Sequence, residues 1–121
     1  MELRDIYAPV SGELEEIKET LVGIRNVDYA WLSEQLARVV RGTGKVIRPS
    51  LTLLAGKTFP GFAENKACLM PMAVSVELMH TATLVHDDAI DKAETRRGQA
   101  TMNSIWGDEI AILMGDYLFA K

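Results

Sequence analysis

Three aspartates, Asp87, Asp88 and Asp91, lie within five positions of the sequence and directly follow an apolar run. On a helix Asp87 and Asp91 share a face, and Asp88 lies one turn from Asp91. Carboxylates at this spacing repel one another, and the C-terminal end of a helix is already partly negative. A bound Mg²⁺ would offset both costs and could also bind substrate phosphates. The cluster therefore indicates either a magnesium site or a solvated acidic helix end.

Two adjacent arginines, Arg96 and Arg97, follow the aspartates. Their planar guanidinium groups suit phosphate oxygens, although a surface ion pair with Glu94 or another exposed acid is the simpler alternative. His80 lies two helical turns before Asp87. It is either part of the same site or a core histidine bonded to a backbone carbonyl.

A second basic segment, "GTGKVIRP", contains Gly42, Gly44, Lys45 and Arg48. The glycines permit close backbone approach and expose amides to an anion, while Lys45 and Arg48 add positive charge. It is not a Walker-type phosphate loop, because Val46 stands where that motif requires Ser or Thr. The alternative is a loop between helices with incidental charge. Taken with the aspartates and arginines, the segment favours a site for two polyanions with a metal on one of them.

The elements that position these residues are predicted to be helices throughout. Apolar periodicity predicts helices at 13–24, 28–41 and 49–59, a long helix that starts between 64 and 71 and ends near 91, and a last helix at 104–121. Asp28 is the expected N-cap of the second helix, and Pro49 is expected in the first turn of the third. No strand is predicted, and residues 92–103 are polar and aperiodic. We expect an all-α chain that forms a single helical unit over residues 1–121.

Composition excludes several classes of protein. The 121 residues are 48% hydrophobic with a formal net charge of −4 and no basic block, which argues against binding of nucleic acid or an anionic membrane. The apolar stretch 67–86 contains Pro71, Glu77 and His80, so we interpret it as a buried core helix and expect no transmembrane segment. A single cysteine, Cys68, and the lack of a secretory signal favour the cytoplasm. The helix pattern runs to Lys121 without a cap, so we expect the front part of a longer chain.

The motifs "GKVIRP" (44–49), "VELMHTATLVHDDAIDKAETRRG" (76–98) and "GDYLFAK" (115–121) together resemble the N-terminal part of the trans-isoprenyl diphosphate synthases, or polyprenyl synthetases. The resemblance implies an all-α isoprenoid synthase fold around a central cavity, usually a homodimer. It also implies a transferase that joins an allylic diphosphate to isopentenyl diphosphate and releases pyrophosphate.

The resemblance also implies roles for individual residues. Asp87 and Asp91 would bind Mg²⁺ on the allylic diphosphate with Asp88 supporting the cluster, and Arg96 would contact that diphosphate. The isopentenyl diphosphate would be held by Gly44, Lys45, Arg48, His80 and Arg97. Ala82 and Thr83 occupy the positions that gate chain length in the family, and their small size implies a medium- or long-chain product of the octaprenyl type.

Two departures from the family pattern affect these expectations. Thr43 replaces a glycine that is common in the first loop, and the second aspartate-rich motif is absent from the 121 residues. We therefore expect this chain to be inactive alone. The alternative to a synthase fragment is a non-catalytic partner subunit of a two-component synthase, which would not need intact aspartate and arginine motifs. A terpene cyclase of related fold is disfavoured because it would not need Lys45, Arg48 and His80.

Overall fold

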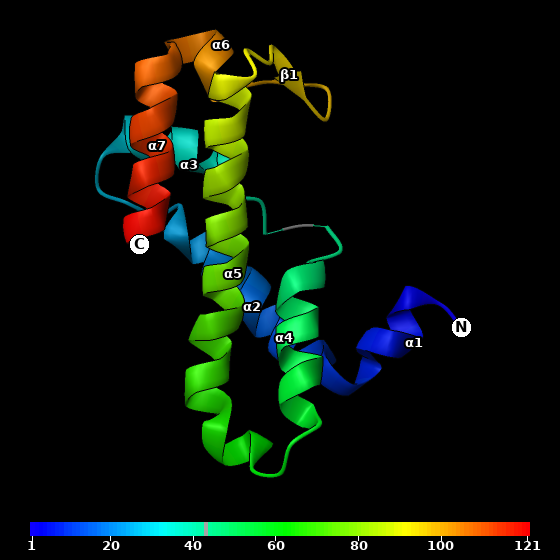
Figure 1. The fold of residues 1–121 in the computed structure, drawn as a ribbon. Helices are drawn as coiled ribbons and strands as arrows, with labels where there is room; N and C mark the ends of the chain where they lie inside the picture. The colour runs from blue at the N-terminus through cyan, green and yellow to red at the C-terminus, as the bar shows by residue number, and fades with distance from the viewer. Residues whose placement is uncertain (43) are drawn as a thin grey trace. The chain divides into compact units, whose positions relative to one another are not determined.

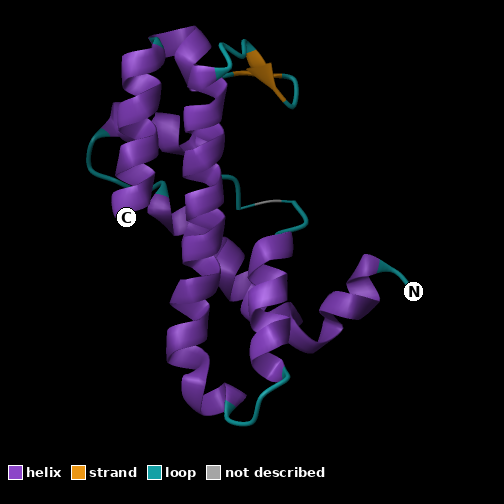
Figure 2. Ribbon diagram, viewed as in Figure 1, coloured by secondary structure: helices purple, strands orange, loops and turns teal. Residues whose placement is uncertain are grey.

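A computed structural model describes residues 1–42 and 44–121; Thr43 lies outside the described residues. Its elements are shown in Figures 1 and 2. In chain order they are α1 (Leu3–Tyr7), the 3₁₀ helix η1 (Ala8–Val10), α2 (Ser11–Ile24), α3 (Ala30–Val39), α4 (Ile47–Lys57), α5 (Phe62–Ile90), β1 (Thr95–Arg96), β2 (Gln99–Ala100), α6 (Met102–Trp106) and α7 (Asp108–Ala120). The chain divides into two compact units, Met1–Glu77 and Leu78–Lys121.

The all-α class predicted from the sequence is confirmed, but four local predictions are wrong. α5 begins at Phe62, before the predicted start between 64 and 71. α3 begins at Ala30 after Tyr29, which makes no side-chain cap, so Asp28 is not its N-cap. Residues 95–100, predicted to lack strands, form a short antiparallel hairpin. The predicted last helix is two helices, because Gly107 has a φ of 86° and separates α6 from α7.

The first unit is organised around α2, which buries one apolar stripe of Leu14, Ile17 and Leu21. These residues are three and four positions apart, as expected for one face of a helix. α4 packs against α2 and η1, and it runs antiparallel to the first half of α5 (Figure 1). A Cβ at Gly56 of α4 would lie 2.8 Å from the end of the Leu69 side chain, so alanine at this position would require Leu69 to shift.

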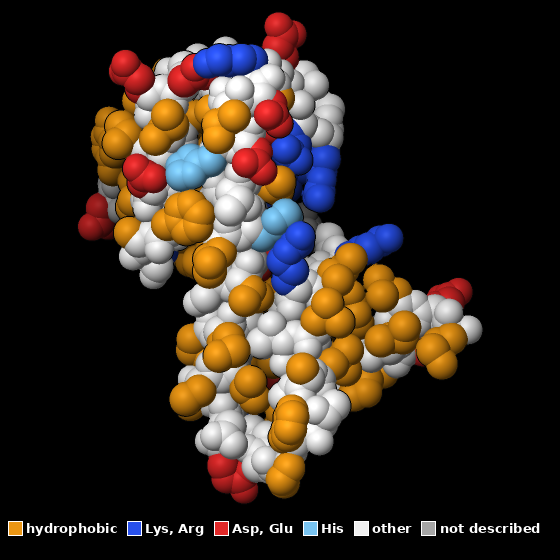
Figure 3. Space-filling model, viewed as in Figure 1, with side chains coloured by type: hydrophobic (Ala, Val, Ile, Leu, Met, Phe, Trp, Pro, Cys, Tyr) orange, Lys and Arg blue, Asp and Glu red, His pale blue; other side chains and the backbone are white. Residues whose placement is uncertain are grey.

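The first unit also exposes a broad apolar surface. Figure 3 shows hydrophobic side chains over α1 and α4. The large apolar residues exposed there are Leu3, Ile6, Ile47 and Leu51. A contiguous apolar surface of this kind differs from the isolated exposed side chains that are normal on soluble proteins.

Helix α5 is 29 residues long and contains Pro71. By length and composition alone it could cross a membrane, although core helices of soluble proteins meet the same criterion, and 28% of its most apolar window is buried. One stripe is buried, including Leu78, Ala82 and Val85, whereas Met79 is 54% exposed, so the fully buried core helix expected from the sequence is not what the structure shows. The helix is therefore buried along one face rather than all round.

The second unit contains the end of α5, the hairpin, α6 and α7. α7 runs antiparallel beside the last turns of α5 (Figures 1 and 2). The imidazole Nε2 of His86 lies 3.0 Å from the Ile112 carbonyl oxygen, and the ring lies directly over Gly115. A Cβ at Gly115 would overlap that ring, with Cε1 2.9 Å away and two other ring atoms closer. Gly115 thus lets the helix end that carries the aspartates pack closely against α7.

Candidate functional site

The aspartate cluster lies at a capped helix end. The backbone amides of residues 91, 92 and 93 bond to the carbonyls of residues 87, 89 and 88 at 2.8, 3.4 and 2.9 Å. Lys92 has a φ of 54°. A left-handed residue with this crossed pair of hydrogen bonds is a Schellman cap. The cap ends the helix at Ile90, one residue earlier than predicted, and still holds Asp91 one turn beyond Asp87.

Lys92 also ties this cap to the next long helix. Its Nζ forms an ion pair with the Asp108 carboxylate in the first turn of α7. Both side chains are well exposed, so the pair adds little stability in water. The left-handed backbone of Lys92 is the more consequential feature, because glycine is the usual residue at this position of a cap.

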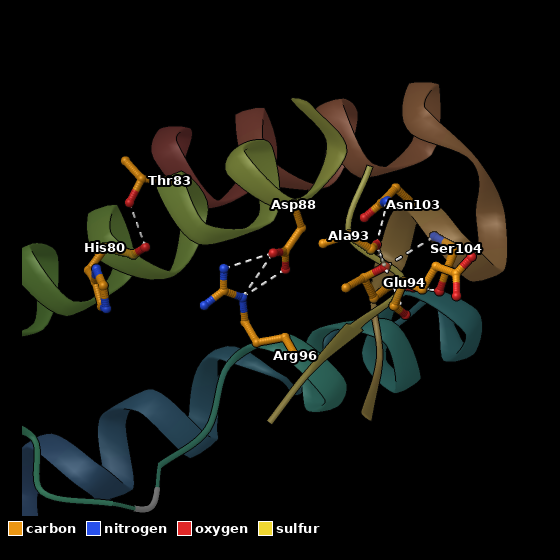
Figure 4. Close-up of polar contacts among 9 residues, drawn as sticks. His80, Thr83, Asp88, Ala93, Glu94, Arg96, Asn103 and Ser104 are labelled. Carbon is orange, nitrogen blue, oxygen red and sulfur yellow. Dashed lines mark hydrogen bonds and ion pairs between the residues drawn. The ribbon is translucent and has the colours of Figure 1, made fainter. Parts of the chain in front are cut away.

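The three carboxylates are in different environments. Asp88 is 7% exposed, and its oxygens accept hydrogen bonds from Arg96 Nε at 2.8 and 3.1 Å and from Nη2 at 2.7 Å (Figure 4). Asp87 and Asp91 are exposed. Within residues 1–42 and 44–121, neither of their side chains has a hydrogen bond or an ion pair. Across the described part of the chain, no group of three or more His, Cys, Asp or Glu side chains is placed to hold a metal ion.

Arg96 is a permanent cation at this site. Its hydrogen bonds to Asp88 raise the pKa of the guanidinium, burial opposes this, and the charges of Asp88, Asp87 and Asp91 raise it further. The group therefore stays protonated at any practicable pH. Its partner is the buried Asp88 rather than Glu94 or another exposed acid, and the bidentate geometry fixes the orientation of the guanidinium plane.

The second arginine occupies the turn of the hairpin. β1 and β2 pair with Thr95 opposite Ala100 and Arg96 opposite Gln99, which leaves a two-residue loop of Arg97 and Gly98. Their φ values are 50° and 75°. Positive φ at both positions is the requirement of a type I′ hairpin turn. Arg97 is therefore exposed at the tip, separated from the Asp88–Arg96 pair.

The base of the hairpin depends on residues that the sequence analysis did not single out. The Ala93 carbonyl accepts hydrogen bonds from Thr101 Oγ1 at 2.7 Å and Asn103 Nδ2 at 2.9 Å (Figure 4). Thr101 is also the N-cap of α6, because Oγ1 accepts from the Ser104 amide at 3.2 Å. The only sequence signal for this cap is a threonine before a helix, a weak one on its own.

The basic loop belongs to the first unit. Lys45 and Arg48 are exposed, and Gly44 has a φ of 111°. Val46, the N-cap of α4, has a φ of 39°, and its carbonyl accepts from the Ser50 amide at 3.0 Å and from Ser50 Oγ at 2.8 Å. These bonds hold a β-branched residue in a backbone conformation that it rarely adopts. Lys45 also lines a surface cleft of about 560 Å³.

Backbone strain coincides with the candidate motifs in both units. Among the described residues, the non-glycine residues with positive φ are Val46, Lys92 and Arg97. One lies in the basic loop, one caps the aspartate helix and one forms the arginine turn. Strain of this kind persists where the surrounding structure enforces it, and it concentrates at functional sites.

The residues predicted to gate chain length differ in burial. Ala82 is completely buried, whereas Thr83 is exposed and its hydroxyl donates to the His80 carbonyl at 2.7 Å. His80, Ala82 and Thr83 share the second unit with the aspartates and arginines, whereas Lys45 and Arg48 belong to the first unit. Eight of the eleven predicted site residues therefore belong to one unit, and Gly44, Lys45 and Arg48 belong to the other.

The sequence matches a known protein family over most of its length. Residues 29–121 match the family model described as polyprenyl synthetase. The chain belongs to the polyprenyl synthetase family. It is 37% identical to heptaprenyl diphosphate synthase component 2 of Geobacillus stearothermophilus and 38% identical to a short chain isoprenyl diphosphate synthase of Methanothermobacter thermautotrophicus, in each case over 100% of this chain. These alignments cover 37% and 36% of the two relatives, so this polyprenyl synthetase sequence spans about a third of their length.

A solved structure agrees with the fold. Polyprenyl synthase from Caulobacter crescentus, crystallised with calcium and isoprenyl diphosphate, matches 98% of this chain with a TM-score of 0.79 and 27% identity, and the match covers 35% of that protein. The family and the isoprenoid synthase fold implied by the sequence motifs are therefore confirmed.

Proposed function

We propose that this polyprenyl synthetase sequence forms part of a prenyltransferase that condenses an allylic diphosphate with isopentenyl diphosphate and releases pyrophosphate. The main support for this proposal is the arrangement of side chains at the end of α5. There Asp87 and Asp91 project free carboxylates from a capped helix end, beside a guanidinium that Asp88 holds in place. Free acids beside a fixed cation suit a ligand that carries both a metal ion and negatively charged oxygens.

The donors at this site fit Mg²⁺. Asp87 and Asp91 supply hard oxygen ligands, and neither carboxylate is committed to another described group. Asp88 is committed to Arg96, so we propose Asp87 and Asp91 as metal ligands and Asp88 as the residue that orients Arg96. When bound, Mg²⁺ would neutralise charge on the departing diphosphate. The Caulobacter crescentus polyprenyl synthase was crystallised with calcium, another oxygen-binding divalent cation.

Arg96 would assist the same step from the protein side. Two of its nitrogens bind Asp88, and within the described residues Nη1 makes no hydrogen bond. A fixed guanidinium with a free nitrogen can donate to a phosphate oxygen as the allylic carbon–oxygen bond breaks. It needs little reorganisation at that moment, which makes preorganised charge effective in catalysis.

The assignment of the second substrate rests on the family resemblance and on backbone strain in two segments. We propose that Gly44, Lys45, Arg48, His80 and Arg97 hold isopentenyl diphosphate, and that the full-length protein is a cytoplasmic homodimer. Strained backbone at Val46 and Arg97 supports a functional role for both segments.

Product length also remains a proposal. The small side chains of Ala82 and Thr83 favour a medium- or long-chain product of the octaprenyl type. The relatives include both a heptaprenyl synthase component and a short chain synthase at nearly equal identity, so overall similarity does not select a length.

A second candidate is a partner subunit of a two-component synthase. It is favoured by the name of one relative, heptaprenyl diphosphate synthase component 2. A subunit of this kind would be inactive alone and active after mixing with its partner. The free carboxylates of Asp87 and Asp91 favour a chain that itself binds the metal.

Transfer of labelled isopentenyl diphosphate by the full-length protein tests the proposal. Asp87→Ala should reduce turnover by at least ~100-fold, the usual scale for loss of a group that stabilises transition-state charge. Glu109→Ala is the matched control, because Glu109 is an exposed acid of the same unit, in the first turn of α7. Unchanged turnover in Asp87→Ala would refute the proposed site.

A further inference from the structure

The Ala93 carbonyl marks the point where the chain leaves the α5 cap and enters the hairpin. It accepts two side-chain hydrogen bonds, from Thr101 Oγ1 at 2.7 Å and from Asn103 Nδ2 at 2.9 Å. Both donors come from beyond the hairpin, at the start of α6. A carbonyl with both lone pairs used by side chains is a fixed point of the backbone.

Thr101 joins three segments at this point. Its side chain donates to Ala93 and accepts from the Ser104 amide, and its own amide donates to the Glu94 carbonyl at 3.1 Å. Thr101 is 5% exposed, so water competes poorly for these bonds. The two ends of the 93–101 segment are thereby closed against each other.

The hairpin is thus held at two places. Thr101 and Asn103 fix its base, and the Asp88–Arg96 pair fixes one strand to the last turn of α5. Arg97 at the tip has no such tie within the described residues, and its position follows from the base and from the two-residue turn. Loosening the base would let both arginines move relative to the aspartates.

We propose that Thr101 and Asn103 are positioning residues that set the arginines Arg96 and Arg97 relative to the carboxylates at the end of α5. The proposal rests on the proposed function, because it assigns the arginines to substrate diphosphates. Neither Thr101 nor Asn103 would touch a substrate. Their effect passes through the Ala93 carbonyl.

Four variants of the full-length protein separate this role from simple stability. Thr101→Val removes the donor to the Ala93 and Glu94 carbonyls and the acceptor for the Ser104 amide. Asn103→Ala removes the Nδ2 donor to Ala93 and a buried Oδ1 that has no hydrogen-bond partner within the described residues. Thr101→Ser keeps the hydroxyl. Ser104→Ala is the matched control, because among residues 1–42 and 44–121 the Ser104 hydroxyl bonds only to the Thr101 carbonyl. Two measurements apply: hydrogen exchange of backbone amides 94–100 and the KM for each diphosphate.

Thr101→Val and Asn103→Ala should each accelerate exchange in 94–100 and raise KM by roughly three- to tenfold, the scale of one lost hydrogen bond. We expect kcat to change less, and Thr101→Ser and Ser104→Ala should behave as wild type. If Asn103→Ala left both exchange and KM unchanged, or if Thr101→Val lowered only the melting temperature, the proposal would be overturned. Hydrogen exchange needs no substrate. It therefore tests the positioning role of Thr101 and Asn103 even if a fully active Asp87→Ala variant refuted the proposed function.

Discussion

Substitution of Gly115 by alanine tests the packing of the aspartate-bearing helix against α7. The His86 ring lies over Gly115. Its Nε2 is 3.0 Å from the Ile112 carbonyl oxygen, and its ring centroid is 5.6 Å from the ring centroid of Phe119. Gly115 is 29 positions from His86 along the chain, yet its missing side chain defines the space that the ring fills.

Two opposing terms determine the effect of Gly115→Ala. In a helix interior alanine is favoured over glycine by about 0.5–1 kcal/mol. The new Cβ would lie within 3.0 Å of three ring atoms of His86, and overpacking of this kind costs about 1–3 kcal/mol. We therefore expect a net loss in the free energy of unfolding of about 1 kcal/mol.

A double-mutant cycle separates the two terms. In a His86→Ala background the ring is absent, so Gly115→Ala should stabilise the protein by about 0.5–1 kcal/mol. The coupling energy then equals the overlap term, about 1–3 kcal/mol. Gly12→Ala in α2 is the matched control, because a Cβ there meets nothing within 4 Å and should only stabilise.

Urea denaturation of the full-length variants gives each free energy of unfolding, provided that the slope against denaturant stays constant. The sign of the Gly115→Ala effect should reverse when His86 is removed. A destabilisation of equal size in both backgrounds would show that His86 and Gly115 do not interact as described.

Three further predictions concern the site. Lys92→Gly should be more stable than Lys92→Ala by about 1 kcal/mol in denaturation, because only glycine relieves the left-handed backbone. Asp88→Asn should lower stability by about 1–3 kcal/mol by weakening a buried charged hydrogen-bond pair, and its KM for allylic diphosphate should rise as Arg96 loses its orientation. Thr83→Phe should shorten the product in a chain-length assay, whereas Ala82→Phe should chiefly destabilise by about 1–3 kcal/mol, since Ala82 is fully buried.

Each of these comparisons has an outcome that would contradict it. Equal stability of the two Lys92 variants would remove the strain argument. An Asp88→Asn protein with unchanged KM would show that Asp88 does not orient Arg96. Unaltered product length in Thr83→Phe would place the floor of the product site elsewhere.

Much of the helical fold could be predicted from hydrophobic periodicity. Leu14, Ile17 and Leu21 recur at helical spacing and are buried in α2 as expected. The spacing of Asp87 and Asp91 was equally readable, because a backbone hydrogen bond between these two residues keeps the helical register past the end of α5.

The errors arose where local signals were short or unusual. A hairpin with two residues in each strand is too short to show alternation, and Arg97–Gly98 is not one of the common turn pairs. The helix break at Gly107 was missed because an isolated glycine is also tolerated inside helices.

The contacts that organise the site are set by tertiary structure. Asp88 was expected to support the metal cluster, and its sequence position carries no sign that Arg96 would occupy both of its oxygens. The same holds for the Ala93 carbonyl, since a backbone acceptor has no sequence signature. Periodicity identifies which residues share a face, but it does not identify the partner across a loop.

The proposed metal site is best tested by calorimetric binding of an unreactive allylic diphosphate analogue to the full-length protein, with Mg²⁺ and with a chelator. We predict tight binding only with Mg²⁺ and loss of that dependence in both Asp87→Asn and Asp91→Asn, because these two carboxylates would hold the Mg²⁺ that assists diphosphate binding. Equally tight binding in the presence of the chelator, or full Mg²⁺ dependence in both variants, would contradict it.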